Sequence, residues 1–82
     1  MKRITDHFEF RLNERFGFEI STLEKLLKKP KMINSNSEEL RNYPHLKNTF
    51  IKYPKCTLVI EESLNMCIAT EGGVLITCYS LN

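Results

Sequence analysis

His7, Arg11 and Arg15 are the residues of this sequence best suited to chemistry, because they recur at every fourth position. Histidine accepts or donates a proton near neutral pH, and the planar guanidinium of arginine binds anions through paired hydrogen bonds. On a helix, three side chains at this spacing cover about 80° of the surface and form one cationic ridge. The alternative is an ordinary solvated face, in which the arginines pair with Glu14, Glu19 or a strand carboxylate.

A second candidate pair, Thr77 and Tyr79, lies near the end of the chain. In an extended strand these two side chains point to the same face, together with Leu75. The other face of that strand would carry Val74, Ile76 and Cys78. Strands favour threonine and tyrosine in any case, so the pair alone is a weak functional signal.

The ridge requires a helix, which we predict over residues 5–16. Asp6 and Glu9 are typical of a helix start, and Gly17 of a helix end. The apolar side chains of this segment also recur at every fourth position, at Phe8, Leu12 and Phe16.

A second, shorter helix is predicted to begin at the Ser21-x-x-Glu24 pattern and to end before Pro30. Residues 31–46 are the least readable stretch, with a loop and one helical turn near 37–41. Four extended segments follow, at residues 48–53, 57–62, 66–70 and 74–80.

The Glu71-Gly72-Gly73 sequence between the last two strands is typical of a tight hairpin turn. Helices first and strands second indicate an α+β fold, in which two helices cover one face of a four-stranded antiparallel meander. At 82 residues the chain, 1–82, is expected to be a single domain.

Composition excludes several classes of protein. With 41% hydrophobic and 27% charged residues, the chain is expected to be globular rather than disordered. Its apolar runs are far shorter than the roughly 20 residues of a bilayer span. The basic pair at the start has no apolar stretch behind it, so no secretory signal is indicated and we expect a cytoplasmic location. The initial methionine favours a chain that stands alone over a piece of a larger toxin.

The formal net charge of +2 is too small to indicate nucleic acid binding by itself. Residues 1–31 contain eight basic and five acidic residues, against four and five in the rest. Any anion-binding surface is therefore expected in the N-terminal third.

The odd number of cysteines and their spacing indicate neither a disulfide framework nor a zinc site. We expect Cys56, Cys67 and Cys78 to be reduced and buried, and we expect no metal or cofactor.

Taken together, the His7-x-x-x-Arg11-x-x-x-Arg15-x-Gly17 helix, the strand meander and the terminal Thr77-x-Tyr79 resemble the barnase/EndoU/colicin/RelE-like (BECR) nuclease superfold. Toxic ribonucleases of the contact-dependent and RelE-like kinds are built in this way. The resemblance covers nearly the whole chain in element order, but only five or six specific residues carry it.

The resemblance implies metal-independent RNA cleavage, in which the ribose 2′-hydroxyl attacks the adjacent phosphate and leaves a 2′,3′-cyclic phosphate. His7 would exchange the proton, and Arg11 or Arg15 would stabilise charge on the phosphate. Thr77 would orient the phosphate, and Tyr79 would donate a hydrogen bond, shuttle a proton or stack on a base.

RNA, with tRNA as a candidate, is the partner implied by the resemblance, together with a cognate inhibitor or another protein. Lys28, Lys29 and Lys31 would steer RNA towards the site, or simply complement a helix C-terminus. His45 competes with His7 as the functional histidine, and we favour His7. The alternative functions are a mobile-element or phage-type protein that binds a protein partner without catalysis, and RNA binding without cleavage.

Overall fold

The computed structural model describes residues 3–27 and 30–81, which form five β-strands, three α-helices and short 3-10 turns. The first part of the chain contains β1 (Arg3–Ile4), α1 (Asp6–Phe16), α2 (Ile20–Leu26) and β2 (Lys31–Ile33). Two 3-10 turns, η1 (Glu38–Asn42) and η2 (Pro44–Leu46), lead into α3 (Lys47–Lys52). The second part contains β3 (Thr57–Glu61), the 3-10 turn η3 (Glu62–Leu64), β4 (Met66–Glu71) and β5 (Val74–Ser80).

The strands form one mixed sheet in the order β1-β5-β4-β3-β2. The consecutive strands β3, β4 and β5 are antiparallel, as the sequence predicts, and Gly72 and Gly73 form the tight turn between β4 and β5 with positive φ angles of 58° and 81°. The strand β2 adds to one side antiparallel to β3, and β1 adds to the other side parallel to β5. The α+β class is therefore confirmed, but the prediction of a four-stranded, wholly antiparallel sheet is wrong.

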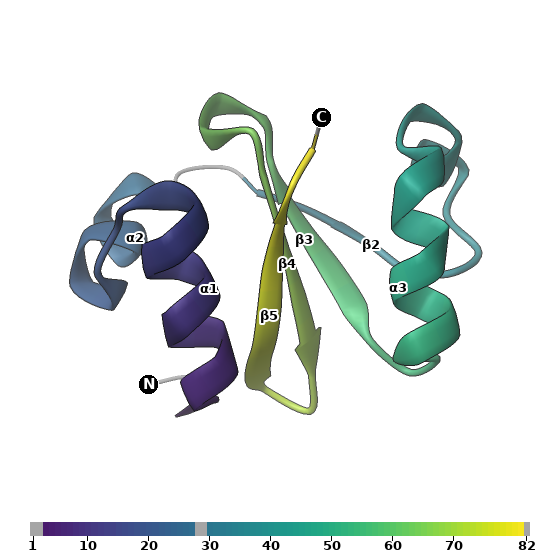
Figure 1. Ribbon diagram of the computed structural model, residues 1–82. Coiled ribbons are helices and arrows are strands. Elements are labelled where there is room, and N and C mark those ends of the chain that lie inside the picture. Colours follow the sequence, from purple (N-terminus) through teal and green to yellow (C-terminus); the bar gives the residue numbers. More distant parts are fainter. Residues whose placement is uncertain (1–2, 28–29, 82) are drawn as a thin grey trace.

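Helices cover both faces of this sheet rather than one. Figure 1 shows the sheet almost edge-on, with α1 and α2 on one side and α3 on the other. Each face has its own apolar core. Phe8, Leu12 and Leu23 pack with Val59, Ile68 and Cys78 on the first face. Leu46, Phe50 and Leu58 pack with Ile60 and Cys67 on the second.

The helix α3 stands where the sequence predicts a first strand over residues 48–53. Phe50 is buried and Ile51 is 77% exposed, so this segment turns one helical stripe towards the sheet. The stripe consists of Tyr43, Leu46, Phe50 and Tyr53, which recur at three- and four-residue spacing and all contact the same core. This helical period outweighs the local preference of phenylalanine, isoleucine and tyrosine for strands.

Both helices begin within one residue of the predicted positions, but their capping residues differ from the predicted ones. Helix α1 begins after Thr5. The hydroxyl of Thr5 accepts a 3.0 Å hydrogen bond from the backbone N–H of Phe8, so Thr5 and not Asp6 caps the helix. Helix α2 begins after Glu19 without a side-chain cap, so the Ser21–Glu24 box does not form. Gly17 ends α1 in the left-handed conformation, as predicted.

None of the helices within residues 3–27 and 30–81 is long and apolar enough to cross a membrane.

Candidate functional site

The end of the predicted cationic ridge, at Arg15, lies beside the outer edge of β5. Thr5 fixes this placement, because its hydroxyl donates a 2.9 Å hydrogen bond to the carbonyl of Ile76 while it caps the helix. In the described residues β1 pairs with β5 only at Val74 and Leu75, so the rest of that edge has no neighbouring strand. The end of α1 runs beside this unpaired part of β5.

Arg15 contacts the unpaired edge of β5. Its Nη1 donates a 2.9 Å hydrogen bond to the carbonyl oxygen of Cys78, and its guanidinium carbon lies 5.4 Å from the centre of the Tyr79 ring. The guanidinium therefore touches two consecutive residues of the last strand. Because Arg15 remains exposed and Tyr79 half-buried, a ligand can still reach both groups.

Arg11 lies one turn earlier and is already partly engaged. Its Nη1 is 2.7 Å from a carboxylate oxygen of Glu14, and its guanidinium lies 5.6 Å from the centre of the Phe10 ring. The alternative interpretation, a solvated face whose arginines pair with carboxylates, is therefore observed for Arg11. The pair is solvent-exposed at 32% and 46% of the two side chains, so an anionic ligand would displace it at little cost.

The positive charges of Arg15 and Arg11 both act on the buried thiol of Cys78. Burial raises the pKa of this thiol to about 11, and the two guanidinium charges oppose the rise. Arg15 is in direct contact with β5, and the charge of Arg11 acts on the same residue from one turn earlier. His7 stands four positions before Arg11, so the helical repeat places it, exposed to solvent, on the same flank.

Thr77 does not belong to this surface. It is 2% exposed and lies opposite Ala69, a residue of the core beneath α3. Residues directly opposite on neighbouring strands share a face, so Thr77 points away from α1. Tyr79 lies opposite Cys67 and points to the same far side, but it reaches Arg15 around the open edge.

Strict alternation predicts that Thr77 and Leu75 share a face of the sheet. A β-bulge in β5 places them on opposite faces instead. Thr70 pairs with Leu75, and the preceding Ala69 pairs with Thr77, so Ile76 is an extra residue in β5. Leu75 consequently packs with the core under α1 and α2, whereas Thr77 faces α3. The predicted five-residue cluster is reduced to His7, Arg11, Arg15 and Tyr79.

Two other predicted residues, Lys31 and His45, lie away from α1. Lys31, in β2, contacts the carboxylate of Glu62 at 3.3 Å. Lys28 and Lys29 lie outside the described residues. His45 is exposed in η2, in the segment that leads into α3 and thus not beside α1.

The three cysteines are free and buried, as predicted. Burial raises the pKa of the Cys67 thiol to about 12, which makes it a poor nucleophile. Within the described part of the chain, no group of three or more histidine, cysteine, aspartate or glutamate residues is placed to hold a metal ion.

Comparisons with protein-family models, with curated proteins and with solved structures give no match for this chain. Chemically, α1 and the edge of β5 present an imidazole, two guanidinium groups and an aromatic ring, of which Arg15 and Tyr79 are in contact. Sequence reasoning missed Thr5, whose position directly before an acidic helix start is a capping signal, and it had no means of finding the Cys78 carbonyl.

Proposed function

We propose that the chain is a small metal-independent endoribonuclease of the BECR type, with its site along the α1 flank and the open edge of β5. The observation that carries the proposal is the placement of Arg15, which contacts the Cys78 carbonyl and the Tyr79 ring at the end of the ridge. This contact joins the two sequence motifs, on the first helix and on the last strand, that prompted the nuclease interpretation.

The spacing along the helix determines which residues of the ridge can act on the same phosphate. Four residues span about 6 Å along a helix axis and eight span about 12 Å. His7 and Arg11 are therefore near enough to act on one phosphate, whereas Arg15 would bind the next phosphate of the strand. A base beside that phosphate would stack on Tyr79.

In the proposed reaction, His7 accepts the proton of the ribose 2′-hydroxyl as its oxygen attacks phosphorus. The bond from phosphorus to the 5′ oxygen breaks, and that oxygen takes a proton from water. Arg11 stabilises the negative charge that builds up on the non-bridging oxygens. The products are a 2′,3′-cyclic phosphate and a 5′-hydroxyl, and Thr77 takes no part.

The test is incubation of the purified protein with total tRNA, and separately with an unstructured RNA, in EDTA, followed by end-group analysis. His7→Ala should lower the cleavage rate about 100-fold, the usual loss for a positioned general base. His45→Ala is the matched control, because it removes the other exposed histidine, and it should cleave normally. Absence of cyclic-phosphate ends at high protein concentration, or equal cleavage by both variants, rejects the proposal.

A second candidate function is binding of a protein partner without catalysis. It is favoured by Met32, which is 66% exposed on β2, one of the two edge strands of the sheet in the described residues. An edge strand with an exposed apolar side chain is suited to pair with a strand of another chain. Under this function Met32→Lys would abolish partner binding, whereas Arg15→Ala would leave it intact.

A further inference from the structure

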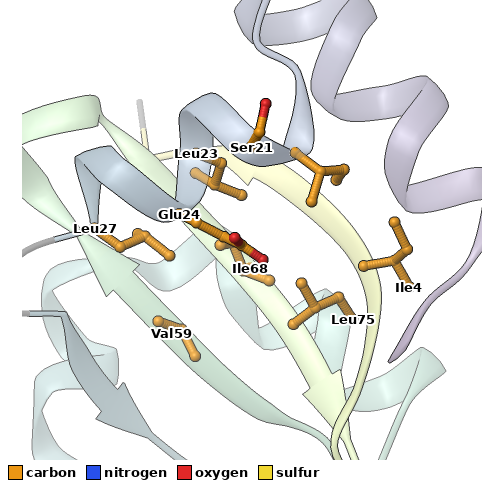
Figure 2. A pocket seen from close by; sticks show the side chains of 9 residues that line it. Ile4, Ser21, Leu23, Glu24, Leu27, Val59, Ile68 and Leu75 are labelled. Atoms are coloured by element: carbon orange, nitrogen blue, oxygen red, sulfur yellow. The ribbon is translucent and has the colours of Figure 1, made fainter. Parts of the chain in front are cut away.

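An apolar pocket of about 570 Å³ lies between α2 and the sheet, on the same face as α1 (Figure 2). Its floor comes from three neighbouring strands, through Val59, Ile68 and Leu75. The walls come from Ile4 in β1, Leu23 in α2 and Leu27, which directly follows α2. The ridge residues His7, Arg11 and Arg15 do not line it, so it is separate from the proposed nuclease site.

Glu24 places a carboxylate in this apolar lining. It follows Ile20 by four positions and precedes Leu27 by three, so it lies on the side of α2 that borders the pocket, where its side chain is exposed to solvent at the mouth. In the view of Figure 2 its carboxylate lies between α2 and Leu75, at the solvent-exposed opening of the pocket. The ion pairs formed among the described residues are Arg11–Glu14 and Lys31–Glu62, neither of which involves Glu24.

We propose that this pocket binds a small apolar molecule that carries one positively charged amine. The volume is in the range of pockets that hold small ligands, which are typically lined by apolar side chains with few polar groups. The apolar part of the molecule would rest on Val59, Ile68 and Leu75. The amine would donate a charge-assisted hydrogen bond to the Glu24 carboxylate, which only accepts.

The net charge of the protein cannot by itself explain a preference for an amine. At a formal net charge of +2, the molecule as a whole repels cations. A preference for an amine over a carboxylic acid of the same length would therefore have to arise locally, at Glu24.

The experiment titrates the protein with octylamine, octanol and octanoate, and follows the shifts of backbone amide signals by NMR. Octylamine should bind most tightly and shift the signals of Leu23, Leu75 and their neighbours. Glu24→Gln should weaken octylamine binding about fivefold or more and leave octanol binding unchanged, because the variant loses the charge and keeps the shape. Glu39→Gln, which removes the same charge from η1, is the matched control and should change neither.

Filling the pocket provides an independent variant. Leu75→Phe keeps a residue that suits a strand and adds volume at the floor, so it should weaken binding of octylamine and octanol alike. Its circular dichroism spectrum and melting temperature would show whether it folds. The proposal is overturned if octylamine binds no better than octanol, if Glu39→Gln weakens it as much as Glu24→Gln, or if no probe shifts the pocket signals.

Discussion

The guanidinium of Arg15 lies 5.4 Å from the centre of the Tyr79 ring, although the two residues sit on opposite sides of the sheet edge. The contact is made around the unpaired part of β5, where Arg15 also binds the Cys78 carbonyl. A cation held over an aromatic face in this way gains about 0.5–1 kcal/mol at an exposed site. The ring therefore helps to position the guanidinium at the end of the ridge.

Replacement of Tyr79 separates the ring from its hydroxyl. Tyr79→Phe keeps the face that Arg15 contacts, so we expect RNA cleavage within about threefold of the parent rate. Tyr79→Ala removes both the contact and the stacking surface, and should lower cleavage at least about tenfold. The measurement is the cleavage rate of a short labelled RNA by the parent and by each variant. An equal, large loss in both variants would mean that the hydroxyl takes part in the reaction.

Thr77 provides a test of the geometry of the proposed site. Because its side chain is 2% exposed and faces α3, Thr77→Val should cleave RNA at the parent rate within about twofold. The measurement is the cleavage rate, together with the melting temperature to monitor folding. A folded Thr77→Val protein that has lost cleavage would place the reaction on the other face of the sheet.

The sequence predicted most of what local pattern controls. The apolar stripe of Phe8 and Leu12 and the turn at Gly72 both lie within a few residues of chain, and both are observed. The facing of Thr77 was not predictable in the same way, because one extra residue, Ile76, reverses the alternation. A bulge depends on the pairing of β5 with β4, and no neighbouring residue signals it.

The two edge strands of the sheet, β1 and β2, also could not be predicted from local sequence pattern. Within the described residues β1 spans Arg3 and Ile4 and β2 spans three residues, so neither is long enough to display a period of two. Both segments are extended because each pairs with a neighbouring strand, and this pairing forms only in the tertiary structure. The contact of Arg15 with Cys78 spans 63 positions and depends on the same folding.

Thr5 links the first helix to the last strand, and its removal should destabilise the protein. The hydroxyl both caps α1 and donates to the Ile76 carbonyl. Loss of a threonine cap costs about 1 kcal/mol and loss of a second hydrogen bond about 1 kcal/mol more, so Thr5→Ala should lower the free energy of unfolding by about 2 kcal/mol.

Urea denaturation measures this change. Thr22→Ala is the matched control, because Thr22 is an exposed residue within α2, and it should change the free energy of unfolding by less than about 0.5 kcal/mol. Equal effects of the two substitutions would show that the bonds of Thr5 contribute nothing to stability.

The buried thiols predict how stability depends on alkaline pH. Burial raises the pKa of Cys67 from its ordinary value of 9.0 to about 12, so the folded protein holds this proton more tightly than the unfolded chain does. The contribution is fully present below pH 9.0, and the free energy of unfolding should fall as pH rises from there towards 12.

Urea midpoints measured between pH 8 and 11 test this dependence, with Cys67→Ala as the comparison. The variant should be less stable at every pH, since it leaves a cavity, but its stability should decline less steeply with pH because one titrating thiol is gone. The same burial should keep all three thiols of the folded protein unreactive towards Ellman's reagent at pH 8 until urea unfolds it. Identical slopes for the parent and the variant, or rapid labelling of a thiol in the folded protein, would contradict the burial of Cys67.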